Sequence, residues 1–311
     1  MRKSGRIRAV AWGLLVAGLA APALRRRAKL APAAVLASAG ATPLLLCVLR
    51  RRTPARDVAV CALNMWAYIA AYEMPHDDPG ALAERVRIDY PIAIDRLLGL
   101  GVAPTVRLQH AFGRPGQIRP FEAFLAWCHW LWFAVPHSAV AYVLLRNRER
   151  FASAAARMYA VFDIGAIFYW ALPTAPPWWA AQRGQLEDGQ ALDVRRMMIE
   201  YGPQFWGKLW PPLFKSLGGN PLAAMPSLHF ATSLMAAEIL SEVDPIAGAV
   251  GWGYAAALGL ALVYLGEHYV IDLVGGAALA EAVRRAAPQA RPLVRRASAR
   301  LERLRDSLEA T

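Results

Sequence analysis

Two histidines and an aspartate have the residue types and the spacing for covalent catalysis. His229 stands at the start of one apolar segment, after Pro226 and Ser227, and His268 stands at the start of another. Asp272 follows His268 at the i, i+4 spacing, so the two side chains share one face of a helix. In that position a carboxylate accepts the N–H of the imidazole, fixes its tautomer and raises its basicity. The pattern predicts a nucleophilic imidazole with an orienting acid, and a second imidazole for proton transfer.

Phosphoryl transfer is the chemistry that these side chains support. His268, activated by Asp272, can attack phosphorus and form a phosphohistidine. His229 can protonate the leaving oxygen and then take a proton from the incoming alcohol or water. The backbone N–H groups that open the helix at Ser227 can hold phosphate oxygens. Two interfacial histidines and a helix-end carboxylate without a catalytic role are the alternative interpretation, which the cost of ionisable groups in a membrane disfavours.

The elements that must position these residues are predicted to be membrane-spanning helices. Of the 311 residues, 57% are hydrophobic and 19% are charged, and the mean hydropathy is +0.27. This composition excludes a disordered chain and indicates an all-α integral membrane protein, in which about 20 apolar residues form each span. We predict six core spans and two additional N-terminal apolar segments, from eight candidates at 9–24, 30–49, 57–74, 121–145, 152–172, 226–242, 245–265 and 268–286.

The predicted topology brings the two histidines to one membrane surface. The segment 245–265 crosses back between them, so His268 returns to the side on which His229 begins. Arginines cluster at both ends of the chain and in the loops at 50–56 and 146–150. Because cytoplasmic loops carry excess Lys and Arg, we expect a multi-pass cell-membrane protein with cytoplasmic termini and an outward-facing site. Basic residues at 25–29 disagree with this orientation. The segment 9–24 is predicted to span, to lie in the interface or to be a cleaved signal peptide.

The net charge of +12 does not indicate a nucleic-acid partner. The charges form short clusters between apolar segments, whereas a nucleic-acid binder carries one basic face. The three cysteines, Cys47, Cys61 and Cys128, lack the spacing of a disulfide framework or a zinc site. We therefore expect no metal and no cofactor, since histidines and helix dipoles supply the nucleophile and the charge stabilisation.

The motifs around these residues resemble those of the type 2 phosphatidic acid phosphatase superfamily. Pro226-Ser227-Leu228-His229 and His268-Tyr269 with Asp272 and Gly275-Gly276 are similar to the second and third motifs of its inositol-phosphorylceramide-synthase-like branch. The stretch from Leu172 to Trp178 also resembles that branch, and the resemblance covers roughly 90 to 285. It implies that His268 is the nucleophile, Asp272 its orienter and His229 the proton donor.

One departure from the superfamily concerns the cations that hold phosphate. The phosphatase branch has an arginine where this chain has Leu262, and a lysine where it has Phe112. The synthase-like branch also lacks that arginine. Lys215, Lys208 and Arg183, in the connection 173–225, are the predicted substitutes, with simple solvation as the alternative for each.

Further substrate contacts are predicted around the same site. Ser227 and Tyr269 belong to the motifs themselves. His129 and His137 lie roughly on one face of the segment 121–145 and are predicted to line the substrate cavity. The alternative for both is a core histidine bonded to a neighbouring group.

We therefore predict an enzyme that transfers a phospho head group between a lipid or polyprenyl carrier and an alcohol or polyol acceptor within the lipid bilayer. Lipid phosphate or polyprenyl (pyro)phosphate hydrolysis, with water as acceptor, is the first alternative. A non-enzymatic scaffold or transporter subunit is the second.

The chain is expected to divide into N-terminal membrane segments (1–56), a membrane core (57–286) and a basic cytoplasmic tail (287–311). The tail is predicted to form an amphipathic helix on an anionic leaflet.

Overall fold

The computed structural model describes residues 2–186, 194–217 and 219–310, and their regular structure is helical. Two isolated parallel β-bridges join Arg87 to Thr174 and Thr174 to Ala223, and they do not extend into a β-strand. The predicted all-α membrane fold is therefore confirmed for the described residues. The helices form two compact units, one of residues 1–77 with 284–311 and one of residues 78–283.

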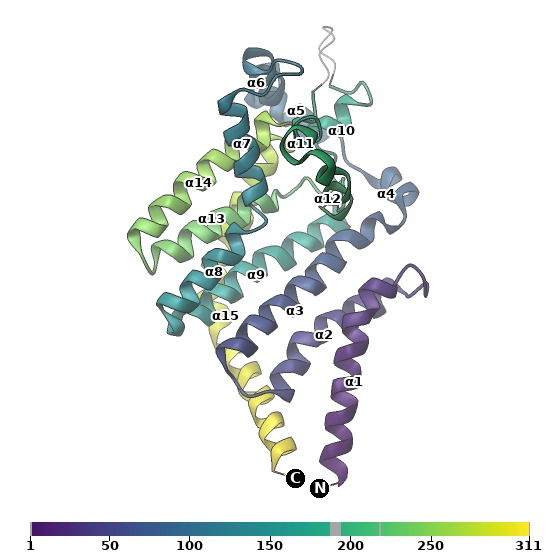
Figure 1. Cartoon of the computed structure of the whole chain (residues 1–311), viewed down its shortest axis with the longest axis vertical. Helices are drawn as coiled ribbons and strands as arrows, with labels where there is room; N and C mark the ends of the chain where they lie inside the picture. The colour runs from purple at the N-terminus through teal and green to yellow at the C-terminus, as the bar shows by residue number, and fades with distance from the viewer. Residues whose placement is uncertain (1, 187–193, 218, 311) are drawn as a thin grey trace. The chain divides into compact units, whose positions relative to one another are not determined.

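The first unit is built from three consecutive apolar helices. Helices α1 (Arg2–Leu24), α2 (Pro32–Leu49) and α3 (Pro54–Glu73) pack in succession and are followed by the 3₁₀ turn η1 (Met74–Asp77) (Figure 1). Proline at the first turn suits the starts of α2 and α3, because the missing N–H would have no partner there. Arg25 joins the loop after α1 to Glu73 at 3.0 Å and to Asp77 at 2.8 Å.

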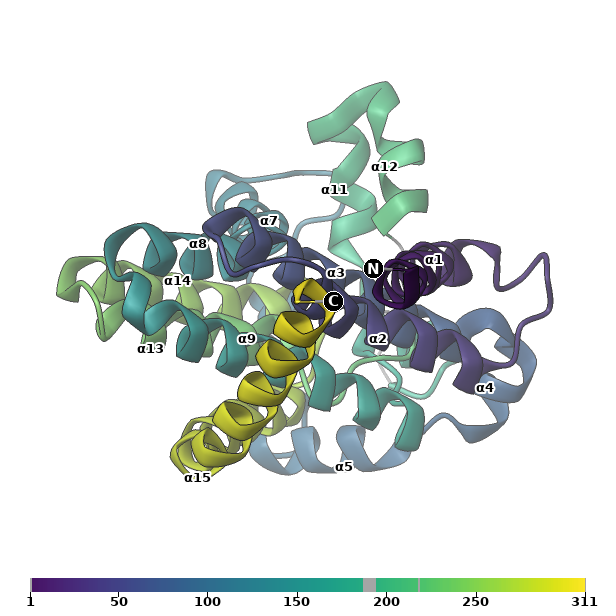
Figure 2. The ribbon, with the colours of Figure 1, turned by 90° about the horizontal axis from the view of Figure 1, so that it is seen from below.

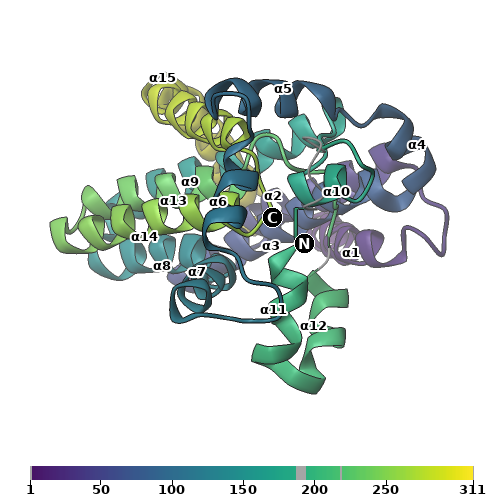
Figure 3. The same cartoon turned by 90° about the horizontal axis from the view of Figure 1, so that it is seen from above.

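The second unit contains the remaining helices and the start of the last one. They are α4 (Pro79–Arg85), α5 (Asp89–Leu98), α6 (Pro104–Phe112), α7 (Pro120–Leu131), α8 (Val135–Arg146), α9 (Arg148–Ala171), α10 (Pro177–Ala181), α11 (Met197–Trp206), η2 (Gly207–Leu209), α12 (Trp210–Leu217), α13 (Leu228–Ser241), α14 (Pro245–Tyr264) and α15 (Val270–Glu309). Helices α8, α9 and α13 lie side by side (Figure 2), and α11 and α12 form a short helical hairpin (Figure 3).

The α13–α14 hairpin is the element that brings the two histidines together. The two helices are antiparallel neighbours (Figure 1), and a Cβ on Gly251 of α14 would stand 2.9 Å from the Cα of Ala237. Asp244 begins α14 by accepting hydrogen bonds from the N–H groups of Ile246 and Ala247. The chain therefore leaves along α13 and returns along α14 to the level at which α13 began.

Among the described residues, four helices are long and apolar enough to cross a membrane, by length and composition. They are Gly5–Leu24, Pro32–Leu49, Arg148–Ala171 and Pro245–Tyr264. The segments predicted at 57–74, 226–242 and 268–286 correspond to α3, α13 and the start of α15, which are not among these four helices. The total of six core spans, like the orientation of the chain in the membrane, stays a prediction.

The segment predicted as a span at 121–145 consists of two helices. Helices α7 and α8 meet at a bend of 60°. Between them, Trp132, Phe133 and Ala134 each donate to the carbonyl three residues earlier, so the helix tightens and stops. Pro136, at the start of α8, has no N–H to offer to a continuous helix, which explains why two helices form here.

The last helix belongs to both units. Helix α15 is 40 residues long, and the division between the units falls between Val283 and Arg284. Its C-terminal part forms the helix that was predicted for the basic tail. The predicted division of the chain into three parts at residues 56 and 286 stays a prediction. The contact of the tail with a membrane also stays a prediction.

Candidate active site

A tight turn between α14 and α15 presents His268. The N–H groups of Glu267 and His268 both donate to the carbonyl of Leu262, which folds the chain back over the end of α14. Gly266 has a φ of +79°, and a Cβ there would stand 2.7 Å from the carbonyl oxygen of Arg195. Only glycine fits this turn without strain, because it tolerates positive φ and has no side chain to clash.

His268 lies between Asp272 and His229. Its Nδ1 is 3.3 Å from Oδ2 of Asp272, and its Nε2 is 3.3 Å from Nδ1 of His229. Oδ2 of Asp272 also accepts a hydrogen bond of 2.9 Å from the N–H of Tyr269. Because His268 and Asp272 are buried, the carboxylate favours the tautomer with the proton on Nδ1. That tautomer leaves Nε2 with a free electron pair on the side of His229.

The start of α13 is joined directly to the start of α15. Ser227 accepts a hydrogen bond from the N–H of Phe230 and so caps α13. Its own N–H donates to the backbone carbonyl of Asp272 at 2.9 Å. A Cβ on Gly276 would come within 2.5 Å of the carbonyl oxygen of Ser227, so the two helix starts are in close contact. The helix N-terminus that carries His229 is thereby held against the element that carries His268 and Asp272.

The other predicted site residues divide into near and distant groups. The ring of His129 stacks on that of His229, with 5.0 Å between centroids. His137 stacks instead on Phe162 and Tyr159, at 5.9 and 6.2 Å. Tyr269 is fully buried in an apolar cluster, and its hydroxyl has no hydrogen-bond partner among the described residues. The structure thus brings His129 to the two central histidines, whereas His137 packs against other rings.

Of the three predicted substitute cations, Arg183 follows α10, whereas Lys208 and Lys215 lie on η2 and α12. Arg183 stacks over Trp179 with its Cζ 3.2 Å from the ring centroid. Lys208 and Lys215 are exposed, and within the described ranges neither makes an ion pair. Their role in holding phosphate stays a prediction.

Asp95, to which the sequence assigned no role, holds the start of α15. Its carboxylate accepts hydrogen bonds of 2.9 Å from Val270 and 3.0 Å from Ile271, both from backbone N–H groups. Burial raises the pKa of this carboxyl to about 6, although the two N–H donors oppose that rise. A carboxylate inside the amphipathic helix α5 was the available signal, but its partners lie far along the chain.

A pH-dependent loss of stability is expected from Asp95. Since its pKa in the fold lies above the ordinary value of about 3.9, the native state binds the proton more tightly than the unfolded state does. Its contribution to stability is therefore present below about pH 4 and falls by about 3 kcal/mol in total as the pH rises through about 6. Thermal unfolding in detergent should show the Asp95→Asn variant gaining stability relative to wild type across this range. A pH-independent difference between the two proteins would contradict the assignment.

Gln109 is a second residue that sequence reasoning missed. Its amide nitrogen donates to the carbonyls of Arg195 and Tyr264, and its amide oxygen accepts from the N–H of Arg195. On the same helix, Thr105 donates to the carbonyl of Val263 at 2.7 Å. Helix α6 therefore satisfies carbonyls at the end of α14 and ties the segment before α11 to them.

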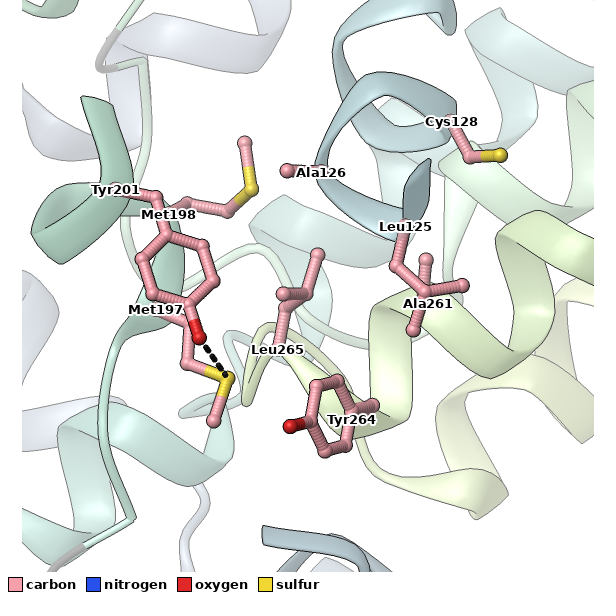
Figure 4. Close-up of a cluster of buried hydrophobic side chains, with 9 residues drawn as sticks. All are labelled: Leu125, Ala126, Cys128, Met197, Met198, Tyr201, Ala261, Tyr264 and Leu265. Atoms are coloured by element: carbon pink, nitrogen blue, oxygen red, sulfur yellow. Dashed lines mark hydrogen bonds between the residues drawn. The ribbon is translucent and has the colours of Figure 1, made fainter. Parts of the chain in front are cut away.

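A buried cluster of apolar side chains lies beside the turn that follows α14. Leu265, Tyr264 and Ala261 meet Leu125 and Ala126 of α7, with Met197, Met198 and Tyr201 of α11 on the other side (Figure 4). The hydroxyl of Tyr201 reaches the sulfur of Met197 at 3.6 Å, and that of Tyr264 donates to Glu122 at 2.6 Å. This packing fixes α11 and α7 against the turn that carries His268.

The described residues contain no group of three or more His, Cys, Asp or Glu side chains arranged to hold a metal ion. The chemistry that the site supports without one is nucleophilic attack by Nε2 of His268, with His229 placed to transfer a proton. The absence of a metal requirement stays a prediction.

Comparison with known families gives one match. A family model described as the PAP2 superfamily matches residues 92–284, which is more than half of the chain and includes His229, His268 and Asp272. No curated protein and no solved structure matches the chain significantly. The inositol-phosphorylceramide-synthase-like branch is not distinguished by this match.

Proposed function

The chain belongs to the PAP2 superfamily of membrane phosphatases and phosphotransferases, and on that premise we propose that it transfers a phospho head group from a lipid or polyprenyl carrier to an alcohol. The observation that carries the proposal is the alignment of Asp272, His268 and His229 through two contacts of 3.3 Å. In this arrangement the imidazole of His268 is oriented as a nucleophile, and the imidazole of His229 faces its Nε2 atom.

In the first step, the electron pair on Nε2 of His268 attacks the phosphorus of the donor. A P–N bond forms, the bond from phosphorus to the carrier oxygen breaks, and that oxygen takes a proton from His229. Asp272 accepts the N–H at Nδ1 of His268 and so stabilises the positive charge that develops on the ring.

In the second step, the hydroxyl of the acceptor attacks the phosphorus of phospho-His268. His229, now neutral, takes the proton from the hydroxyl, and the P–N bond breaks with its electron pair returning to Nε2. The other backbone N–H groups at the start of α13, besides that of Phe230, which donates to Ser227, are suited to hold phosphate oxygens in both steps.

Two observations support transfer over hydrolysis. His268 is only 4% exposed, and the ring of Trp132 lies 4.1 Å from that of His229 between centroids, so bulk water has limited access to the reacting groups. The motifs Pro226-Ser227-Leu228-His229 and His268-Tyr269 also resemble those of the inositol-phosphorylceramide-synthase-like branch. Hydrolysis would use the same three residues with water as the acceptor.

The proposal is tested by incubating the purified protein with phospholipid or polyprenyl-phosphate donors, with and without polyol acceptors. We expect a new phosphorylated product that depends on the polyol, and little free phosphate. Phosphate release at the same rate with and without the polyol would identify a hydrolase. No product from any donor would favour the non-enzymatic alternative.

A further inference from the structure

The proposed reaction places a negatively charged phosphoryl group beside two histidines, so a nearby cation is expected to bind it. Leu262, which stands where the phosphatase branch has an arginine, is completely buried and contributes only its carbonyl to the turn. The cation must therefore come from another element. The candidates named from the sequence, Lys208, Lys215 and Arg183, make no hydrogen bond to the histidines among the described residues.

Arg196, at the start of α11, is held beside the residue that precedes His268. Its Nε donates to Oε1 of Glu267 at 3.2 Å. Its Cζ stands 3.9 Å from the centroid of the Trp178 ring, and 5.7 Å from that of Phe214. The guanidinium is thus fixed on an aromatic face by a cation–π contact and oriented by one charged hydrogen bond.

The backbone holds Arg196 and Trp178 to the turn that presents His268. The N–H of Met197 donates to the carbonyl of Leu265 at 3.3 Å, and the N–H of Trp178 donates to that of Gly266 at 3.2 Å. Gln109 fixes the residue before Arg196 through both its N–H and its carbonyl. The cation is therefore tied to the catalytic turn from both sides, and little ordering is left for substrate binding to supply.

Arg196, Trp178 and His129 each have polar atoms without a hydrogen-bond partner among the described residues. Within the described ranges, the two terminal nitrogens of Arg196 make no hydrogen bond. The buried indole N–H of Trp178 and the buried Nδ1 of His129 are also unsatisfied there. The charges of Arg196 and Glu267 act on the His129 ring, which stacks on His229. Arg196 pairs with the residue that precedes His268 and stacks on Trp178, and a ligand with several acceptor oxygens would satisfy the donors of both side chains.

We propose that Arg196 binds the phosphate of the lipid substrate, with Glu267 as the counter-ion that orients it. The inference rests on the proposed function, because it assumes that phosphate reacts at His268. The two terminal nitrogens of a guanidinium match two phosphate oxygens, a geometry that lysine does not reproduce. The sequence predicted Lys208, Lys215 or Arg183 for this role. The ion pair with Glu267 points to Arg196 instead.

The test compares Arg196→Gln and Arg196→Lys with a matched control, Arg195→Gln. Arg195 is the neighbouring arginine and also pairs with a glutamate, Glu200. Gln109 hydrogen-bonds only to the backbone of Arg195, so the substitution leaves those bonds in place. We expect kcat/KM to fall about 10²-fold or more in Arg196→Gln and about 10-fold or more in Arg196→Lys, with the control within about 3-fold of wild type. Orthovanadate should raise the Tm of wild type and of the control, and fail to raise that of Arg196→Gln.

The outcomes separate this inference from the proposed function. If Arg196→Gln keeps wild-type kcat/KM and the orthovanadate response while His268→Ala is inactive, the phosphate is bound elsewhere and only the inference is wrong. If Arg183→Gln, rather than Arg196→Gln, loses both properties, the sequence-based candidate replaces Arg196. If His268→Ala also remains active, the proposed function itself is overturned. Normal unfolding of Arg196→Gln in detergent would exclude a general loss of structure as the cause of a lower rate.

Discussion

Replacing His268 with alanine should lower turnover by about 10⁴-fold or more while the protein remains folded. The proposed nucleophile has no substitute at that position, because His229 has no carboxylate partner among the described residues and faces Nε2 of His268 through Nδ1. The measurement is product formation by purified protein in detergent, together with trapping of a ³²P-labelled phosphoenzyme. The label should be acid-labile, as a phosphohistidine is, and absent from His268→Ala.

His110→Ala is a suitable control for that experiment. His110 is exposed on α6 and lies outside the residues that contact His268. It should keep wild-type activity and form the same phosphoenzyme. Full activity of His268→Ala on every donor tested, or a phosphoenzyme that forms without His268, would contradict the covalent mechanism.

Replacing His229 with alanine should lower turnover of lipid donors by about 10³-fold, within the range expected for loss of a general acid and base. The loss should depend on the leaving group, because a good one such as p-nitrophenolate departs without a proton. With such a donor the first step should be nearly normal and the second step slow, since His229 also activates the acceptor. The phosphoenzyme should therefore accumulate in His229→Ala, as measured by a burst of p-nitrophenolate.

A different result would change the assignment of His229. An equal loss with good and poor leaving groups, without accumulation of the phosphoenzyme, would indicate that His229 only positions His268. The stacking of His129 and Trp132 on His229 makes such a packing role the physical competitor. The leaving-group dependence distinguishes the two, because packing does not respond to the basicity of the departing oxygen.

The central part of the site could be predicted because it depends on local rules. The spacing of His268 and Asp272 is a property of one helix turn, and the return of His268 to His229 follows from a helical hairpin. Both are short-range consequences of the sequence, and the structure reproduces them with contacts of 3.3 Å. The cap that Ser227 forms on α13 is local in the same way, because it depends on residues within one helix turn.

The supporting residues could not be predicted because their partners lie far away in the chain. Asp95 and Gln109 bond to groups that only the packing of α5 and α6 brings near. Arg196 lies in a connection of mixed composition, where periodicity carries no information about side-chain direction. The break at Trp132 to Ala134 was missed for another reason, since hydropathy alone does not register how Pro136 divides an apolar segment.

The hydrogen bond from Ser227 to the Asp272 carbonyl, with the close contact at Gly276, has a consequence for work in different lipids. Membrane helices tilt when bilayer thickness changes. Here the elements that carry His229 and His268, the proposed proton donor and nucleophile, are joined within a few residues of both, so tilting moves the two side chains together. Acyl-chain length should therefore alter how substrates reach the site more than the chemistry within it.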